Sequence, residues 1–415
     1  MAAPAEPQSE LTSWKGIADY LGVNVRTAQR WELERGLPVR RFPGERGRVS
    51  ADPRELVAWK AATLEKPDWW TSVPFLRRYA LGLTAVVLVL LLGALAAYLV
   101  ANRRGPPALY RVQGRTVIIS DGQGRELWRK TFEQTPIPPG EQREMAWFGD
   151  LDGDGATEVL LGYAPEPGSA LICYSERGTQ KWRFVPGRSV STPAETFTPT
   201  YHLRNFAVAP IGSGGANAVV VNSRHYAYFP SQVAVLSARG ELLGEYWHSG
   251  GFYCVAVADV DHDGVQEIVL GGVSQGHKQA TLVILDPRRL GGASVEDEAP
   301  RYQIQGFPPA REKARLLFPR SCINRKFEPY GQMFHLLAAP DSLTAHVHQR
   351  AVSSANHTIA YELTPHLELK QLIVPDTFRA LHQELEASGQ LDHKLSEREE
   401  AELRKIRYLV GGPGR

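Results

Sequence analysis

The chain has 415 residues and a formal net charge of +2, which excludes a globally basic nucleic-acid coat protein and a chain dominated by an acidic tail. Hydrophobic residues make up 43% and charged residues 22%, so wholesale disorder is excluded as well. Three cysteines are too few for a disulfide-dense scaffold or a cysteine-rich zinc cluster. At about 150 residues per domain, the length indicates two or three domains.

The N-terminal part carries the start and stop signals of short helices. Ser13 and Asn24 stand where N-caps are expected, and Gly22 and Gly36 stand where helices end. These signals predict helices over 14–21 and 25–35, the second with an exposed face of Arg, Thr and Gln. A short strand, a turn at 43–47 and a return strand follow, and Asp52 opens a third helix.

Two short helices followed by such a wing are typical of a DNA-binding winged helix-turn-helix. Residues 23–32 resemble the V-x-x-R-T-x-x-R-W-E core of the MerR/excisionase type. The resemblance implies that the second helix meets the major groove and that the wing arginines meet phosphate or the minor groove. A winged helix kept for protein contacts is the alternative. The expected DNA-binding residues are Arg26, Thr27, Gln29, Arg30, Arg40, Arg41, Arg46 and Arg48.

The run 80–100 contains no charged residue and is flanked by pairs of arginines. At 1.5 Å per residue it is about 31 Å long, close to the roughly 30 Å of a bilayer's hydrocarbon core. We therefore expect a transmembrane helix over 79–101, preceded by a juxtamembrane linker at 67–78. Since DNA is found in the cytoplasm, this predicts a single-pass inner or cytoplasmic membrane protein. Its N-terminus would be cytoplasmic and its C-terminal domain periplasmic or extracellular.

Two segments further along share the pattern D-x-D-x-D-G-x-x-E. Alternate carboxylates around a turn converge on one point, and hard oxygen ligands at this spacing suit Ca²⁺. The pattern predicts two Ca²⁺ sites, each completed by a backbone carbonyl, and the alternative is a pair of Asp-rich surface turns. The expected ligands are Asp150, Asp152, Asp154, Ala156 and Glu158 in the first loop, and Asp259, Asp261, Asp263, Val265 and Glu267 in the second.

A third, degenerate copy at 206–221 keeps the turn glycine, Gly215, but lacks the four acids. Each copy is followed by an apolar strand, a Gly turn and often an aromatic residue, and a spacing of about 50 residues is typical of propeller blades. The loops and strands resemble FG-GAP/VCBS repeats, the integrin-alpha-like propeller family. The resemblance implies a mainly β, propeller-like domain over 105–375 with about five blade-like units. In that family the Ca²⁺ loops brace the blades, and ligands bind elsewhere.

The expected fold class is therefore multidomain. It comprises a small all-α winged helix-turn-helix over 10–66, one transmembrane helix, the mainly β domain and a helical tail over 376–415. Because no hydrolase, P-loop or zinc-protease motif is present, an enzyme is the least favoured of three interpretations.

The favoured interpretation is a membrane-anchored DNA-binding transcription regulator with an extracytoplasmic calcium-binding propeller as its sensor. The alternative is a surface binding or adhesion propeller whose N-terminal domain is only a cytoplasmic anchor or protein-contact module. The expected partners are DNA, the membrane, an unknown extracytoplasmic ligand or protein, and a second copy of the chain in a homodimer.

Overall fold

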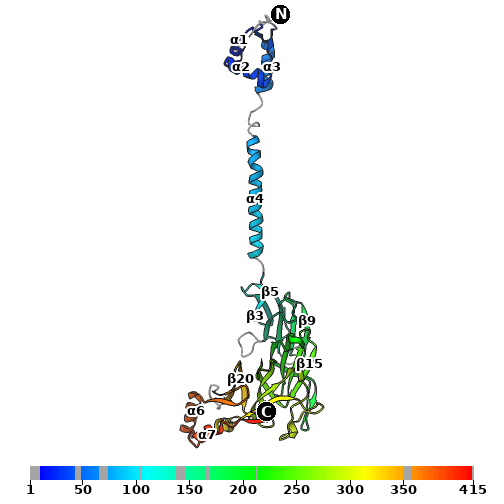
Figure 1. Ribbon diagram of the computed structural model, residues 1–415, viewed down its shortest axis with the longest axis vertical. Coiled ribbons are helices and arrows are strands. Elements are labelled where there is room, and N and C mark those ends of the chain that lie inside the picture. Colours follow the sequence, from blue (N-terminus) through cyan, green and yellow to red (C-terminus); the bar gives the residue numbers. More distant parts are fainter. Residues whose placement is uncertain are drawn as a thin grey trace. The chain divides into compact units, whose positions relative to one another are not determined.

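The chain divides into two compact units, Met1–Arg103 and Arg104–Arg415, and each is described separately (Figure 1). The structure is a computed structural model. The residues that it describes are 10–42, 48–64, 73–101, 104–136, 145–164, 169–211, 213–349 and 357–413.

The first unit begins with helices α1 (Trp14–Leu21) and α2 (Val25–Arg35), whose ends confirm the predicted caps. Ser13 accepts a hydrogen bond from the N–H of Gly16, and Asn24 accepts one from the N–H of Thr27. Gly22 and Gly36 end the helices in the left-handed conformation, at φ values of 71° and 67°. Local signals of this kind are readable because the partners lie within one turn.

The two short strands predicted on either side of the turn are confirmed, so the all-α class given to this domain is wrong. Strands β1 (Arg40–Arg41) and β2 (Val49–Ser50) form an antiparallel pair before helix α3 (Pro53–Leu64). Val49 of this pair packs in the same cluster as the helices, and the buried Ser50 donates its hydroxyl to Glu10 at 3.1 Å. The predicted turn at 43–47 lies outside the described residues.

Helix α4 (Val73–Ala101) covers the segment for which a transmembrane helix was predicted. Among the described residues, no helix has both the length and the apolar character that a membrane crossing requires. The predicted transmembrane helix at 79–101 and the single-pass membrane localisation are therefore corrected.

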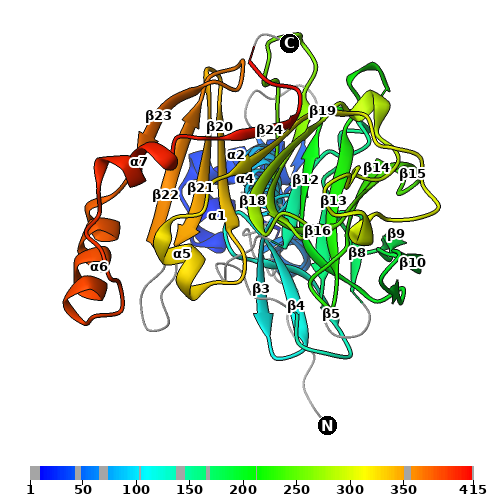
Figure 2. The same cartoon turned by 90° about the horizontal axis from the view of Figure 1, so that it is seen from below.

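The second unit is a propeller-like series of antiparallel sheets, each followed along the chain by the next (Figure 2). Five sheets have three or more strands among the described residues, in agreement with the expected number of blade-like units. The sheets, in chain order, are β3 (Pro107–Gln113), β4 (Thr116–Asp121) and β5 (Glu126–Thr131); β6 (Ala146–Gly149), β7 (Glu158–Tyr163), β8 (Ala170–Tyr174) and β9 (Gln180–Phe184); β12 (Tyr201–Ala209), β13 (Ala218–His225), β14 (Ser231–Ser237) and β15 (Leu242–His248); β16 (Gly250–Ala258), β17 (Glu267–Ser274), β18 (Gln279–Leu285), β19 (Glu312–Phe318) and β24 (Arg407–Val410); and β20 (Gln332–Ala339), β21 (Ser342–Gln349), β22 (His357–Leu363) and β23 (Leu369–Ile373). A smaller pair, β10 (Val190–Ser191) and β11 (Thr196–Phe197), lies between the second and third of these sheets in the sequence.

Alternate residues of the central strands enter different hydrophobic clusters. In β7, Val159 and Leu161 pack in a cluster with β4, whereas Leu160 packs in a cluster with β13. In β13, Val219 packs toward β7 and Val220 packs toward β17. Successive side chains of a strand point to opposite faces, so each central strand is apolar on both faces and is covered by a neighbouring sheet on each side.

The predicted aromatic residue after each Gly turn has a structural role between sheets. Trp128 of β5 and Trp182 of β9 each donate their indole N–H, over 2.9 Å, to a carbonyl in the turn of the following sheet. The glycines of those turns, Gly178 and Gly240, lie so close that an added Cβ would come within 2.7 Å of the indole ring. The Trp ring therefore occupies the place of a side chain on the neighbouring turn.

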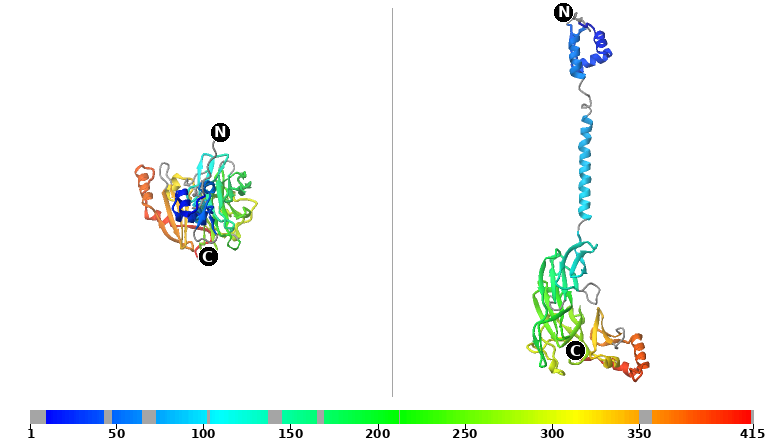
Figure 3. Two further views of the ribbon diagram at one scale, coloured as in Figure 1. Left: turned by 90° about the horizontal axis from the view of Figure 1, so that it is seen from above. Right: turned by 180° about the vertical axis from the view of Figure 1, so that it is seen from behind.

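The C-terminal part covers the last sheet (Figure 3). Helix α6 (Asp376–Ala387) buries Phe378, Leu381 and Leu385 in a cluster shared with β21 and β22. The short helices α5 (Cys322–Phe327) and α7 (Glu397–Glu402) precede and follow it in the chain. The tail that was expected to be helical ends instead in a strand, β24, which pairs with the edge of β19 and removes that exposed edge.

We predict that Gly240→Ala and Gly178→Ala lower the stability of the second unit more than Gly124→Ala does. All three glycines have φ between 78° and 81°, which costs an alanine about 1–2 kcal/mol. An added Cβ meets the indole ring at Gly178 and Gly240 but no atom within 4 Å at Gly124, so overpacking adds about 1–3 kcal/mol at the first two. Thermal unfolding of the full chain measures the difference. Equal losses in the three variants would contradict the Trp–Gly contact.

Candidate functional site

Three of the eight residues predicted to bind DNA are engaged with acidic partners in the first unit. The guanidinium of Arg41 forks onto Glu32 at 2.7 and 3.0 Å, and Arg40 donates to Glu55 at 2.8 Å. Arg30 lies 3.6 Å from Glu34. A guanidinium that forks onto a carboxylate is not presented to a phosphate or a guanine edge.

The other predicted residues are placed differently. Thr27 donates its hydroxyl to the cap residue Asn24 at 2.9 Å, so it serves the helix start. Arg26, Gln29 and Arg48 are exposed, and Arg46 lies outside the described residues. The interpretation of this domain as a DNA-binding, MerR-like helix-turn-helix finds no support in the comparisons below and is corrected, while the role of each individual residue stays a prediction.

The first acidic loop has the geometry predicted for it. Asp150 accepts hydrogen bonds from the N–H groups of Gly153 and Gly155 at 2.7 and 2.9 Å. Both glycines have positive φ values, so the chain turns sharply around the Asp150 carboxylate. The carboxylates of Asp150, Asp152, Asp154 and Glu158 each offer an oxygen within 4.8 Å of the others.

The second loop repeats this arrangement. Asp259 accepts from the N–H groups of Asp263 and Gly264 at 3.1 and 3.0 Å. Asp259, Asp261 and Asp263 offer oxygens within 4.8 Å of one another. The glutamates that close the two loops, Glu158 and Glu267, are both buried, and each accepts the N–H of the loop's second residue at 2.9 Å. The N–H groups of Ala156 and Val265 bond to the preceding aspartates, and ligation by their carbonyls stays a prediction.

A lysine that the sequence reasoning missed reaches into each acidic loop. Lys181 of β9 lies 2.7 Å from Asp152 and 2.9 Å from Glu158. Lys313 of β19 lies 2.6 Å from Asp261 and 2.7 Å from Glu267. The two lysines thus place an ammonium where the loop pattern predicts a metal ion.

Both lysines occupy the same place in their sheets. Each stands at an irregularity of the fourth strand, where the pairing register with the third strand shifts. The corresponding residue of the third sheet is Leu243, and the loop of that sheet is the degenerate one without acids. A lysine therefore accompanies the acidic loops and a leucine accompanies the acid-free loop.

The ammonium groups of both lysines stay protonated in this setting. Partial burial opposes the charged form, but hydrogen bonds to Asp152 and Glu158 outweigh it and raise the pKa of Lys181. The same balance, with Asp261 and Glu267 as partners, raises the pKa of Lys313. The hydrogen bond from Lys181 lowers the pKa of Asp152, so this carboxylate is ionised at neutral pH. The arrangement holds one cation already, and a calcium ion has to displace the lysine or share its carboxylates.

A second candidate site is formed by three successive sheets, with three of its residues on first strands, one on the second strand β13 and one on the turn after β13. Tyr253 of β16 stacks at 4.4 Å on Phe334 of β20, with the guanidinium of Arg204, from β12, 5.8 Å from its ring. Arg224 lies 5.3 Å from the Tyr253 ring and 4.9 Å from that of Tyr228. We call these five residues the first-strand face.

The first-strand face combines cationic groups with an exposed aromatic ring. Tyr228 is 69% exposed and has a φ of 80°, which is strained for a bulky residue. Burial, with the neighbouring His335 and His346, lowers the pKa of His348 to about 4, so that histidine is neutral at pH 7. Its ring lies 4.5 Å from Phe334, so it packs there as an aromatic group, and the two arginines carry the positive charge.

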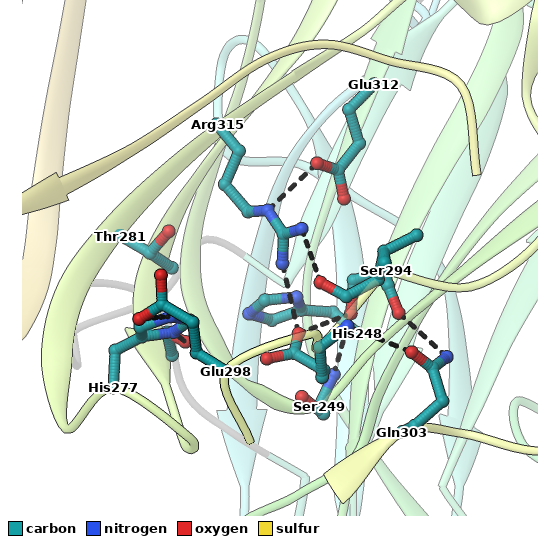
Figure 4. A network of polar contacts seen from close by, with 12 residues as sticks. His248, Ser249, His277, Thr281, Ser294, Glu298, Gln303, Glu312 and Arg315 are labelled. Carbon is teal, nitrogen blue, oxygen red and sulfur yellow. Dashed lines mark hydrogen bonds and ion pairs between the residues drawn. The ribbon is translucent and has the colours of Figure 1, made fainter. Parts of the chain in front are cut away.

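A buried polar network holds the long connection 286–311 to the fourth of the larger sheets (Figure 4). Arg315 is 3% exposed, lies 3.0 Å from Glu296 and 2.9 Å from Glu312, and donates to the carbonyl of Val295. Tyr246 donates to Glu312 at 2.7 Å. Burial raises the pKa of Glu312, and burial lowers that of the adjacent His248 to about 3. Since the charges are paired and enclosed, we interpret this network as structural.

Comparison with known proteins places the chain near no established family. No family model and no curated protein matches it. It is similar to the solved structure of the Dos1 propeller, at 9% identity and a TM-score of 0.37, over 63% of this chain and 53% of that one. It is also similar to the V. cholerae biofilm matrix protein Bap1, at 14% identity and a TM-score of 0.26, over 59% of this chain and 43% of that one. BBS1N in complex with ARL6DN matches at 11% identity and a TM-score of 0.28, over 66% of this chain and 83% of that one.

The chain thus spans about half the length of the Dos1 propeller structure that it matches. TM-scores below 0.5 carry no argument about the function of this chain. With no matching family model, neither the MerR/excisionase resemblance nor the FG-GAP/VCBS resemblance is shown.

Proposed function

We propose that residues 104–415 are a binding module whose protein partner docks on the first-strand face and whose two acidic loops take Ca²⁺. The observation that carries the first part is the grouping of Arg204, Arg224, Tyr228, Tyr253 and Phe334, contributed by three successive sheets. Tyrosine and arginine are the residues most enriched at the energetic centres of protein interfaces.

The charge of this face indicates the chemistry of the partner. Two guanidiniums lie against aromatic rings here, and the nearby His348 is neutral at pH 7. Arg224 is only 8% exposed, so its charge acts on a partner through the positive potential around Tyr228 rather than by direct bonds to a carboxylate. We therefore propose a partner that presents acidic side chains.

Calcium binding is supported by the repetition of the loop geometry. Two loops in two different sheets each bring carboxylates together, with four converging in the first loop and three in the second. Carboxylates at such a spacing repel one another unless a cation lies among them. Lys313 borders a pocket of about 270 Å³ that is also lined by Asp261 and His366, so a displaced ammonium has space beside the loop.

For the binding face, we predict that a photo-crosslinking amino acid at position 228 captures one discrete partner in cells that express the full chain. Leu242, 50% exposed on the fourth strand of its sheet, is the matched control position and should capture none. With the partner purified, Tyr228→Ala should weaken binding at least about 30-fold, the effect of a residue worth about 2 kcal/mol, while Leu242→Ala should not. Equal capture at 228 and 242, or wild-type affinity of Tyr228→Ala, would contradict the assignment.

For the loops, we predict that the full chain melts at a higher temperature in millimolar Ca²⁺ than in chelator. Binding to the folded form alone stabilises it by about 2.7 kcal/mol at one hundred times Kd. Asp152→Ala combined with Asp261→Ala should remove most of this gain, because each change takes a carboxylate from one loop. Ser213→Ala, in the acid-free loop, is the control and should keep it. The same melting temperature in Ca²⁺ and in chelator would contradict the proposal, because it would show that the lysine ammonium groups are the only cations bound by these loops.

A further inference from the structure

Four side chains with metal-binding groups converge where the C-terminal helices meet. They come from separate places in the chain: Cys322 begins α5, His382 lies in α6, His393 follows α6, and Glu399 lies in α7. Each offers one ligand atom, and these four atoms all lie within 4.8 Å of one another. The four residues have no part in the acidic loops or in the first-strand face.

Two of these side chains hold buried atoms without a hydrogen-bond partner. His382 is fully buried, and its Nε2 has no hydrogen bond. Both carboxylate oxygens of Glu399 also lack a hydrogen bond of good geometry, and the groups nearest to them are the other candidate ligands, Cys322 and His393. The imidazole Nε2 atoms of His382 and His393 lie 3.8 and 3.3 Å from Glu399 Oε2. Polar atoms left unpaired in the interior cost free energy, and a metal ion at the point where they converge would satisfy them together.

The other ring nitrogens are held by carboxylates. His382 Nδ1 lies 2.6 Å from Glu386, and His393 Nδ1 lies 2.9 Å from Asp392. Glu386 is in turn held by the N–H of Leu395 at 3.2 Å. A carboxylate on Nδ1 keeps the proton on that nitrogen and leaves the lone pair of Nε2 for a metal, which is the usual arrangement around metal-binding histidines.

We propose that Cys322, His382, His393 and Glu399 bind a zinc ion. One thiolate, two imidazoles and one carboxylate are the ligand types of tetrahedral Zn²⁺, whereas Ca²⁺ takes oxygen ligands only. Tetrahedral zinc bonds of about 2.0–2.3 Å set ligand atoms roughly 3.3–3.8 Å apart, so the cluster needs only a small contraction. Four protein ligands leave no open position, so the ion is structural.

The site fits the architecture around it. A pocket of about 240 Å³, lined among others by His393, Glu399 and Arg325, gives an ion a path from solvent. The ion would tie α5 to α6 and α7, the helices that cover the outer face of the last sheet. Zinc would thereby stabilise the helical cover of the last sheet, β20–β23, which no further sheet follows in the chain.

The test uses the full chain, purified without a histidine tag and dialysed after zinc loading. We expect one zinc per chain by elemental analysis, and a thiolate-to-metal charge-transfer absorption when Co²⁺ replaces zinc. Cys322→Ser should abolish that absorption, and the exposed His393→Ala should reduce bound zinc to a small fraction. Cys173→Ser, which changes a buried cysteine in a different cluster, should leave both readouts unchanged.

Two results would overturn the proposal. One is a wild-type chain that retains no zinc after dialysis. The other is a cobalt spectrum without the thiolate band, or one that Cys322→Ser does not change. His393→Ala keeps the test decisive if the Cys322 variant fails to fold, since His393 is exposed and its loss removes no packed side chain.

Discussion

The second unit depends on the lateral packing of sheets that are apolar on both faces. Val159 and Leu160 are adjacent in one strand and fully buried, yet they belong to different hydrophobic clusters. A sheet of this kind cannot be stable alone, because one covered face still leaves the other in water. Every sheet therefore needs a neighbour, and Trp128 and Trp182 align the outer strands of one sheet with the turns of the next. At the end of the series, α6 supplies the cover that a further sheet would have provided.

This packing determines where functional groups can be placed. The faces of the sheets are filled, so chemistry is left to the strand edges, the turns and the first strands. The acidic loops follow the first strands of two sheets, and lysines from the fourth strands reach them. In the first-strand face, Arg204 and Tyr253 lie on first strands, Arg224 lies on the second strand of its sheet, and Tyr228 lies on the turn that follows it. The packed sheets thus position both candidate sites without contributing their core to either.

The sequence predicts features that depend on neighbours along the chain. The limits of α1 and α2 were predictable because Ser13, Asn24, Gly22 and Gly36 act within one turn of their own helices. The acidic loops were predictable because their carboxylates lie within nine residues, and the Gly-turn units because Gly124, Gly178 and Gly240 need positive φ values.

What the sequence could not predict depends on partners that are distant along the chain. Lys313 meets Glu267 from 46 residues away, and only the register shift in the fourth strand places it there. The Cys322, His382, His393 and Glu399 cluster has no regular spacing that a motif could capture. The arginine-rich second helix and wing indicated DNA, but Glu32 and Glu55 neutralise arginines there, and that was visible only after folding. The apolar run at 80–100 indicated a membrane span, which the described helices do not bear out.

The central claim is that each acidic loop is a cation position which a lysine fills and which Ca²⁺ can enter. Calcium titration calorimetry on the full chain, compared with a Lys181→Met and Lys313→Met double variant, tests it most directly. The account predicts two sites per chain, with binding in the variant tighter by roughly tenfold, or about 1.4 kcal/mol per site, because the competing ammonium is gone. Equal calcium affinity in the two proteins, or no calcium binding by either, would contradict it.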